Sequence, residues 1–401
     1  MILVIPVFVP HAGCPHDCCF CNQKIISGSK KLPGADEIAD KIGSYASEAV
    51  RYGEVEIAFF GGSFTAIEPE AQEHYLRAAA PFLKINGGFA DCIRISTRPD
   101  AIDEKVIERL KKYSVRIVEL GAQSMDDNVL RLSERGHTAE DTRKASALLK
   151  AGGFTLGLQT MTGLPGADRK SDTKTALEIA SIEPAFVRIY PTVVVKNTKL
   201  FRDYEAGLYR PMPLDDAVSL CSELCEIYSK HNISVARIGL QSTDSITING
   251  EESEVAGGPY HEAFGQLVRS YDALQSVSET LDNVLKKHLS GSPGTLTLRT
   301  EPRYFSDALG QNRANAEKLR SSFGFEKVIL SSSADPGGPS TAKRAGRVVS
   351  AESFKPDNAK YEHRLAKVTK AEVTVRREPT GRDSFRIRTD VTAEIVFKSL
   401  K

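Results

Sequence analysis

Three cysteines near the start of the chain have the residue type and the spacing to hold a metal cluster. Cys14, Cys18 and Cys21 form a C-x3-C-x2-C array within one short stretch. Thiolates are soft ligands, and iron–sulfur clusters are held by them. Three side chains of one tight loop can bind three irons of a 4Fe–4S cluster, which leaves the fourth iron free for a small chelating ligand. The array therefore predicts a metal-binding site with one open position.

Two other uses of these cysteines are a structural zinc site and a disulfide. A zinc site usually takes a second pair of ligands, such as a further C-x2-C or a distant His pair. The remaining Cys92, Cys221 and Cys225 show no such pairing with the array. Cys19, directly after Cys18, is interpreted as a bystander rather than a ligand. The iron–sulfur interpretation is therefore favoured.

The stretch around these cysteines resembles the cluster loop of the radical S-adenosylmethionine (SAM) enzymes. Phe20, directly before Cys21, matches the aromatic residue that is usual there. The resemblance implies that the amino and carboxylate groups of SAM chelate the free iron. It also implies that one electron from the cluster splits the sulfonium and gives a 5′-deoxyadenosyl radical. The expected cofactors are thus a 4Fe–4S cluster and SAM, with flavodoxin or ferredoxin as an electron donor.

The chain alternates between apolar runs and segments of helical period. This pattern predicts buried parallel strands covered by helices, bent into a barrel or partial barrel. The resemblance implies an α/β, TIM-barrel-like fold, a partial (β/α)6 radical SAM barrel. The expected strands are 2–9, 55–60, 93–97, 115–120, 155–160, 186–190 and 233–238, and the expected helices are 35–51, 68–82, 103–112, 139–151, 172–182 and 214–231.

Several motifs directly follow these strands, at the rim where such barrels carry their chemistry. Gly61-Gly62-Ser63 resembles the two-glycine turn that meets the amino group of SAM, with Ser63 where many members have an acidic residue. Ser96 stands where relatives carry Glu, and Gln159 stands where coproporphyrinogen oxidases place an Asp against the ribose. Arg98 and Asp100, in the stretch after Ser96, are interpreted equally well as a structural ion pair or as functional residues.

The stretch Gly121-Ala122-Gln123-Ser124 resembles a rim motif of two related groups. These are the catalytic subunit of Elongator and, more distantly, the oxygen-independent coproporphyrinogen oxidases. The resemblance implies that Gln123 binds the ribose of SAM. It further implies that Arg135, in Arg135-Gly136-His137-Thr138, pairs with the carboxylate of SAM, which suits the planar fork of a guanidinium. The alternative for Arg135 is a surface arginine on a helix.

Three residues are candidates for contact with a substrate. Tyr190 and Lys196 lie in a segment that resembles the Elongator-like branch, although packing and solvent are the more common fates of such side chains. His261, in the glycine-rich connector 257–265, could be an acid or base near substrate. The favoured interpretation of His261 is a loop histidine without a chemical role. No acetyl-CoA-type glycine loop is found, so the acetyltransferase domain of Elongator is not expected.

Composition indicates a soluble globular chain with one large and one smaller domain. The 401 residues are 41% apolar and 26% charged. Seven cysteines without a signal peptide indicate a reducing, cytoplasmic compartment, and no stretch is long enough for a membrane helix. We expect a radical SAM core with its connector over residues 1–275. A small basic α+β domain is expected over residues 276–401, with a flexible loop near 331–345.

The second domain is the basic part of the chain. Gly291–Lys401 carries 21 Lys and Arg against 13 Asp and Glu, whereas the rest carries 32 against 39. This asymmetry hints at a polyanionic partner, with a solvated surface as the alternative. Gly310-Gln311-Asn312-Arg313 resembles the glycine loop of KH modules, although a packed helix–strand pair is favoured. We predict that Arg313 and Arg320 share a helix face that binds RNA, and that segments 372–377, 384–388 and 393–397 form an antiparallel sheet.

The favoured function is that of a radical SAM enzyme of the Elongator-like branch, which cleaves SAM reductively and acts in RNA, above all tRNA, modification. A radical oxidase or decarboxylase of a small molecule is the first alternative. A non-catalytic iron–sulfur or SAM-binding protein is the second. Co-purified RNA would favour the RNA-modifying enzyme. Porphyrin absorbance would favour the small-molecule oxidase or decarboxylase. Absence of 5′-deoxyadenosine formation would favour the non-catalytic protein.

Overall fold

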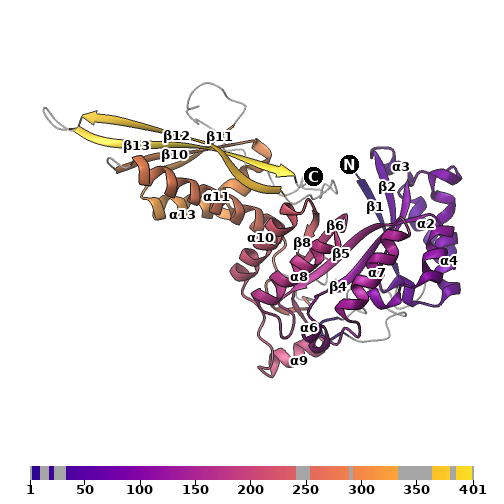
Figure 1. Ribbon diagram of the computed structural model, residues 1–401. Helices are drawn as coiled ribbons and strands as arrows, with labels where there is room; N and C mark the ends of the chain where they lie inside the picture. Colours follow the sequence, from indigo (N-terminus) through magenta and orange to yellow (C-terminus); the bar gives the residue numbers. More distant parts are fainter. Residues whose placement is uncertain are drawn as a thin grey trace. The chain divides into compact units, whose positions relative to one another are not determined.

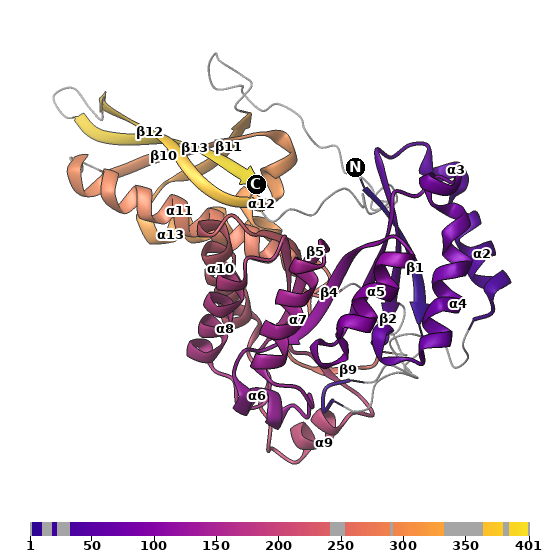
Figure 2. The same cartoon turned by 45° about the vertical axis from the view of Figure 1, so that its right-hand side comes forward.

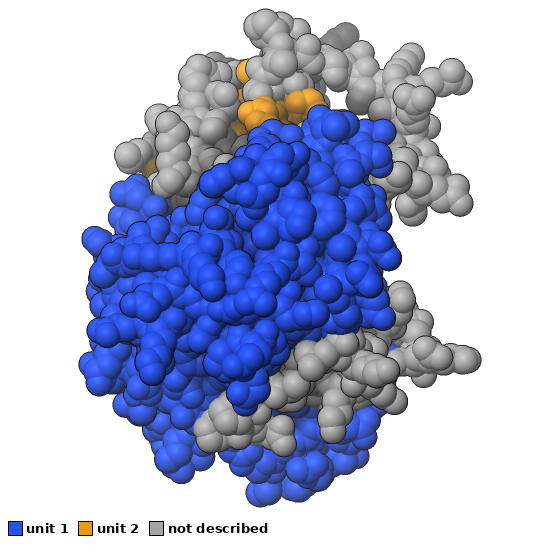
Figure 3. Space-filling view, turned by 90° about the vertical axis from the view of Figure 1, so that its right-hand side faces the viewer, with its two compact units in different colours: residues 1–262, 356–362, 401 blue, residues 263–355, 363–400 orange. Residues whose placement is uncertain are grey.

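The computed structural model of the chain contains two compact units (Figure 3). Unit 1 comprises residues 1–262, 356–362 and 401, and unit 2 comprises residues 263–355 and 363–400. The boundary expected after residue 275 falls inside the continuous helix α11 (Phe264–His288). The expected loop near 331–345 lies, from residue 333 on, outside the described residues. The structure describes residues 2–9, 18–21, 33–240, 253–288, 292–332, 364–379 and 385–399.

Unit 1 is built on one sheet of seven strands in the order β1-β2-β3-β4-β5-β6-β8, with every neighbouring pair parallel. The sheet curls into a half-barrel (Figures 1 and 2), which confirms the predicted fold class. Its strands are β1 (Ile2–Val9), β2 (Glu54–Gly61), β3 (Cys92–Thr97), β4 (Val115–Gln123), β5 (Thr155–Thr162), β6 (Phe186–Pro191) and β8 (Ser234–Ile238). A small antiparallel pair joins β7 (Val194–Val195) and β9 (Val255–Gly257).

Helices of unit 1 cover the outer face of this sheet (Figure 2). The helices of unit 1 are α2 (Ala35–Gly43), α3 (Ala46–Ala49), α4 (Pro69–Ala79), α5 (Glu104–Lys112), α6 (Asp127–Leu132), α7 (Ala139–Ala151), α8 (Arg169–Ile182), α9 (Lys199–Glu205) and α10 (Leu214–Lys230). Of these, the short α6 and α9 lie beyond the ends of the strands rather than on this face (Figure 2). Local sequence fixes the starts of the helices. Asp103 accepts a hydrogen bond from the Val106 N–H at the start of α5, and Thr138 forms a capping box with Asp141 at the start of α7.

Alternation along the strands gives the sheet two different faces. Outward residues such as Ile5, Ile57 and Ile93 are fully buried beneath the helices. Inward residues are less buried: Phe8 is 47% exposed, and Gln159 is half-buried. Because successive side chains of a strand point to opposite faces, the polar residues of these strands line the inside of the half-barrel.

Several expected boundaries differ from the observed ones. The expected helix 35–51 is two helices, and β4 and β5 run on to Gln123 and Thr162. The short helices α6 and α9 were not predicted, because one or two turns carry too little periodicity to be recognised. None of the described helices is long and apolar enough to cross a membrane.

Unit 2 combines α11 with a four-stranded sheet in the order β11-β10-β13-β12. Its remaining elements are β10 (Ser292–Thr300), α12 (Phe305–Leu309), α13 (Ala314–Phe323), β11 (Lys327–Ser332), β12 (Arg364–Pro379) and β13 (Phe385–Ser399). Helices pack against the sheet around a core that includes Leu281, Leu296 and Leu319. The expected antiparallel pairing of the three C-terminal segments is confirmed by β12 and β13, whereas β10 is parallel to both of its neighbours. A crossover through α12 and α13 makes β10 and β11 parallel, and the three expected short strands belong to one long hairpin.

Candidate active site

The described part of the cysteine loop, residues 18–21, is anchored at both sides by backbone hydrogen bonds. The Cys19 N–H donates to the Ser133 carbonyl at 3.1 Å, and the Leu200 N–H donates to the Cys19 carbonyl at 2.7 Å. Cys14 lies outside the described residues, so the structure describes two of the three predicted ligands, Cys18 and Cys21. Consistent with this, the described ranges contain no group of three or more His, Cys, Asp or Glu that could hold a metal.

The Cys19 side chain lies in apolar surroundings. It is 1% exposed and packs in an apolar cluster with Val194 and Leu200. Burial raises the pKa of its thiol to about 12. A metal ligand must be a thiolate, so both features favour the interpretation of Cys19 as a bystander. That interpretation stays a prediction.

Arg135 links the cysteine loop to the end of β4. Its Nη1 donates to Cys18 Sγ at 3.2 Å, and its Nη2 donates to the Gly121 carbonyl at 2.7 Å. The residue is 7% exposed and follows α6 rather than lying on it. The alternative of a surface arginine on a helix was therefore wrong. Its Nε is buried and has no hydrogen-bond partner among the described residues.

A β-bulge brings Gln123 to the same place. The register of β4 against β5 shifts between Gly121 and Gln123, and Gln123 has a φ of 64°. This left-handed conformation is rare for a residue with a side chain, and bulges often redirect a side chain near active sites. A Cβ on Gly121 would lie 2.9 Å from Gln123 Nε2 and 3.2 Å from Arg135 Nη2. Both side chains thus crowd over a glycine, and the buried Gln123 Oε1 has no partner among the described residues.

The sequence around these residues matches known protein families. A sequence model of the radical SAM superfamily matches residues 8–177, and a model of the radical SAM C-terminal domain matches residues 184–273. The chain belongs to the radical SAM superfamily. Radical SAM enzymes use a 4Fe–4S cluster and SAM, so the predicted family, enzyme class and cofactors are confirmed.

Similar proteins lie in the branch that the sequence motifs indicated. The tRNA uridine(34) acetyltransferase of Methanocaldococcus jannaschii is 30% identical over 221 residues, covering 51% of this chain and 41% of that protein. Elongator complex protein 3 of Mus musculus is 27% identical over 189 residues, covering 42% of this chain and 34% of that protein. A solved structure of the archaeal Methanocaldococcus infernus Elp3 with an N-terminal deletion superposes with a TM-score of 0.52. It is 24% identical, and the match covers 67% of this chain and 62% of that one. The chain therefore spans about two fifths of the first of these curated relatives.

The described residues fit the two radical SAM cofactors. Cys18 and Cys21 offer soft ligands, with Cys14 as the predicted third. The buried Nε of Arg135 and Oε1 of Gln123 lack partners among the described residues, and both side chains lie over Gly121. A carboxylate and a ribose hydroxyl are groups that a guanidinium and an amide oxygen can bind.

Arg98 and Asp100 support the radical SAM site from behind. Arg98 is 1% exposed, and its Nε and Nη2 donate to the two oxygens of Asp100 at 2.6 and 2.9 Å. The same Nη2 donates to the Arg135 carbonyl at 2.6 Å. His137 Nε2 lies 3.2 Å from the Ala122 carbonyl inside the bulge. The interpretation as a structural ion pair is thus confirmed, and this pair also holds the backbone of Arg135.

The other predicted SAM-binding residues lie at the rim of the half-barrel. Gly61 has a φ of 106°, and a Cβ there would lie 2.8 Å from the Val9 carbonyl, directly before the cysteine loop. Ser63 is buried. Ser96 is paired in register with Glu119, and Gln159 with Gly121. Phe20 packs against the apolar cluster around Cys19. Their roles toward SAM stay predictions.

The three substrate candidates are less closely tied to this site. Tyr190 is half-buried on β6, beside Met161 of β5. Lys196 is exposed, and its Nζ donates to the Ser253 carbonyl at 2.7 Å. His261 is half-buried in the connector after β9. The structure neither supports nor opposes a chemical role for them.

A chain of buried charges inside the half-barrel was missed at the sequence level. Arg94 pairs with Glu56 at 2.6 Å and with Glu119 at 2.7 Å, and Arg188 pairs with Glu119 at 2.7 Å. These side chains come from β2, β3, β4 and β6. The available signal was a charged residue at an inward position of an otherwise apolar strand. The pairing of these charges could not be inferred from the sequence, because Arg94 and Arg188 are separated from Glu119 by 25 and 69 residues.

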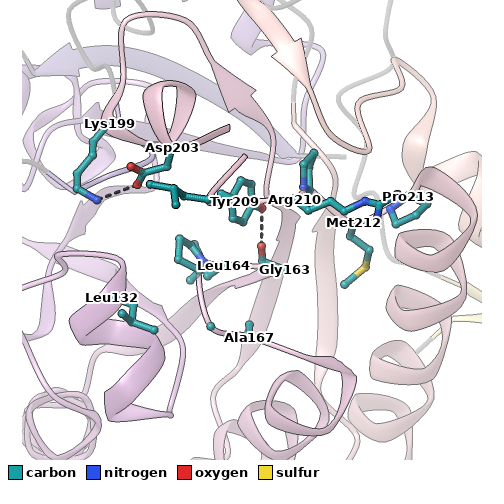
Figure 4. Close-up of a pocket in the computed structure, with 14 residues that line it drawn as sticks. Leu132, Gly163, Leu164, Ala167, Lys199, Asp203, Tyr209, Arg210, Met212 and Pro213 are labelled. Carbon is teal, nitrogen blue, oxygen red and sulfur yellow. Dashed lines mark hydrogen bonds and ion pairs between the residues drawn. The ribbon is translucent and has the colours of Figure 1, made fainter. Parts of the chain in front are cut away.

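A pocket of about 710 Å³ lies beside the cysteine loop (Figure 4). It is bounded by α6, the turn after β5, α9 and residues 208–213. The Tyr209 hydroxyl donates to the Gly163 carbonyl at 2.7 Å, and Lys199 Nζ lies 2.8 Å from Asp203 Oδ2. Tyr209 also packs against the cluster that buries Cys19. The pocket wall thus supports the loop from outside.

Single cysteine replacements should separate the ligands from the bystander. After anaerobic reconstitution, we expect Cys18→Ala and Cys21→Ala to lose most bound iron and sulfide, because each removes a predicted ligand. Cys19→Ala should keep both at the wild-type ratio. Iron and sulfide analysis with visible absorbance checks this. Loss of the cluster in Cys19→Ala alone would show that the ligand triplet is wrong.

The buried His137 should make stability depend on pH. Burial, reinforced by the charge of Arg135, lowers its pKa from 6.5 to about 4. Between these values the unfolded chain binds a proton that the folded chain does not, so acidification favours unfolding. The free energy of unfolding should fall by up to about 1.4 kcal/mol per pH unit across this window. Urea unfolding at several pH values measures the free energy of unfolding of wild type and His137→Gln. If the two proteins show parallel pH profiles, the pH dependence does not come from His137.

Proposed function

We propose that this chain cleaves SAM reductively at its 4Fe–4S cluster and uses the resulting radical chemistry to modify tRNA. The observation that carries the proposal is the contact set of Arg135. Its guanidinium touches both Cys18 Sγ and the Gly121 carbonyl, near Gln123, whose buried Oε1 has no partner in the described part of the chain. When bound, the cluster supplies one electron and SAM supplies the group that is cleaved.

The residues of the chain act by binding and orientation. Cys18 and Cys21, together with Cys14, hold the cluster. Arg135 presents charged N–H donors next to the predicted ligand Cys18, and these donors would bind the carboxylate of SAM. Gln123 offers a buried acceptor to a ribose hydroxyl. Both groups are fixed in advance by the bulge and by Arg98, so little ordering is needed when SAM binds.

The buried charges below the rim keep the inside of the half-barrel rigid. Glu119 receives hydrogen bonds from Arg94 and Arg188, so each charge has an opposite partner. Burial raises the pKa of Glu56, and the nearby Arg94 opposes that shift. Satisfied buried networks of this kind rigidify the strands that carry them. Gln159 and Tyr190 stand on the same inner face, nearer the rim.

The choice of tRNA rests on the relatives and on charge. The Methanocaldococcus jannaschii relative is named as a tRNA uridine(34) acetyltransferase, and its match includes about half of this chain. The basic excess after Gly291 suits a polyanion. An electron donor such as flavodoxin or ferredoxin and a cytoplasmic location complete the proposal.

The proposal is tested on purified tRNA. The reconstituted protein is incubated with tRNA, SAM and a strong reductant, and the tRNA is digested to nucleosides for mass spectrometry. We expect a modified nucleoside with wild type and none with Cys18→Ala. SAM cleavage without any change in the RNA would contradict tRNA as the substrate and favour a small molecule.

A further inference from the structure

Unit 2 contains a β-α-α-β segment with a glycine turn between its helices. The order is β10, α12, the turn 310–313, α13 and β11, and the two strands are parallel neighbours. In KH modules a glycine loop between two helices clamps the backbone of single-stranded nucleic acid. The same order of elements here makes the turn a candidate nucleic-acid-binding element.

The turn is fixed before any ligand arrives. Gly310 has a φ of 73°, and a Cβ there would lie 3.0 Å from the Asn315 side chain. Asn312 and Arg313 are also left-handed, with φ of 50° and 63°. The buried Asn315 amide donates to the Ser270 carbonyl at 2.7 Å, which ties the start of α13 to α11. Such a turn loses little entropy on binding.

The position of Arg313 corrects the predicted basic face. Arg313 precedes α13 rather than lying on it, so it does not share a helix face with Arg320. Arg320 forms an ion pair with Glu317, which reduces its value as a phosphate ligand. Arg313 is exposed and makes no ion pair among the described residues. A positive charge without an ion pair among the described residues therefore lies on the turn itself.

A groove of about 410 Å³ adjoins this turn. Phe305 and Leu309 give it an apolar side, and the polar side and rim come from Gln266, Ser306, Gln311, Asn312 and Arg313. Among the residues that the structure describes, no acidic side chain lines it. Asp307, next to Ser306, is buried and engaged by Arg269 Nε at 2.8 Å. A nucleotide combines an apolar base with an anionic phosphate, which matches a groove with one apolar side and one cationic edge.

We infer that the groove at Gly310–Arg313 binds the sugar–phosphate backbone of a single-stranded RNA segment. The apolar side takes a base, while Arg313 and the N–H groups of the turn take phosphate. This inference rests on the proposed function, since it names the part of the chain that holds the RNA. It does not involve SAM or the cluster.

The test compares two variants that each change the net charge by two. Asn312→Asp combined with Arg313→Asn alters the turn but keeps residues that tolerate a left-handed backbone. Lys318→Glu is the matched control, on the exposed surface of α13 outside the groove. Fluorescence anisotropy measures the affinity of the full-length reconstituted protein for a labelled, unstructured RNA oligonucleotide at several salt concentrations. Thermal unfolding and SAM cleavage without RNA verify that both variants are folded.

We expect the turn variant to bind RNA about tenfold more weakly, with a shallower salt dependence, and Lys318→Glu to bind nearly as wild type. Equal losses in both variants, or none in either, would overturn the site. The DNA oligonucleotide of the same sequence should bind more weakly, and equal affinity would overturn the assignment to RNA. If wild type binds no RNA at all, the proposed function fails as well. If wild type binds but the turn variant binds equally, only this inference fails.

Discussion

Replacing Arg135 by alanine is expected to weaken SAM binding by about 1.5–3 kcal/mol, the range for a hydrogen bond to a charged group. The guanidinium is buried beside Cys18 Sγ and is held at the Gly121 carbonyl, so its donors are already directed when SAM arrives. Calorimetry of SAM binding to the anaerobically reconstituted protein measures the loss. Iron and sulfide content should stay near wild type, because no ligand is removed.

Arg131→Ala is the matched control for this prediction. Arg131 is exposed on α6 and donates to Asn128 Oδ1 at 2.8 Å, and it makes no hydrogen bond or ion pair with the described loop residues 18–21. We expect its SAM affinity to be unchanged. Arg135→Lys should recover only part of the loss, because an ammonium cannot reproduce the planar fork. Equal affinity of wild type and Arg135→Ala would remove Arg135 from the cofactor site.

Replacing Glu119 by glutamine should destabilise unit 1 by about 3–5 kcal/mol, as expected when one partner of a buried ion pair is removed. Glu119 is 3% exposed and accepts from Arg94 and Arg188. The variant leaves the positive charge of Arg188 without its partner and that of Arg94 with Glu56 alone. Urea unfolding followed by circular dichroism measures the change.

The surface pair of Arg116 and Glu54 provides the comparison. Its atoms lie 3.6 Å apart and both side chains are more than a third exposed. Glu54→Gln should change the free energy of unfolding by less than about 1 kcal/mol, since exposed pairs are screened by water and salt. A Glu119→Gln variant as stable as Glu54→Gln would show that the buried chain of charges does not hold the half-barrel together.

Local patterns and a family resemblance predicted the half-barrel and gave Gln123 and Arg135 as candidates for the site. The strands were recognised because each is apolar and ends in a glycine or polar motif, and Arg135 because it follows the Gly121–Ser124 motif at a familiar distance. The structure added the contact between Arg135 and Cys18. It also showed that Arg98, which the sequence left undecided, supports the Arg135 backbone.

The long-range pairing of side chains and the shortest helices could not be predicted from the sequence. The partnership of Glu56, Arg94, Glu119 and Arg188 depends on strand register, which no local pattern specifies. The bulge at Gln123 depends on how β4 meets β5. In unit 2 the parallel pairing of β10 and β11 follows from the crossover between them. The amphipathic α11 was not predicted, because its start was assigned to the glycine-rich connector 257–265. Arg313 was placed on a helix face because the left-handed turn before α13 has no signature beyond Gly310.

The most direct test of the account is whether the reconstituted protein forms 5′-deoxyadenosine from SAM under strong reductant. The measurement uses anaerobic protein with the cluster restored and liquid chromatography of the products. We predict 5′-deoxyadenosine and methionine in equal amounts with wild type, a strong reduction with Arg135→Ala at limiting SAM, and none with Cys18→Ala. A wild-type protein that carries its full iron and sulfide, binds SAM, and forms no 5′-deoxyadenosine would contradict the account.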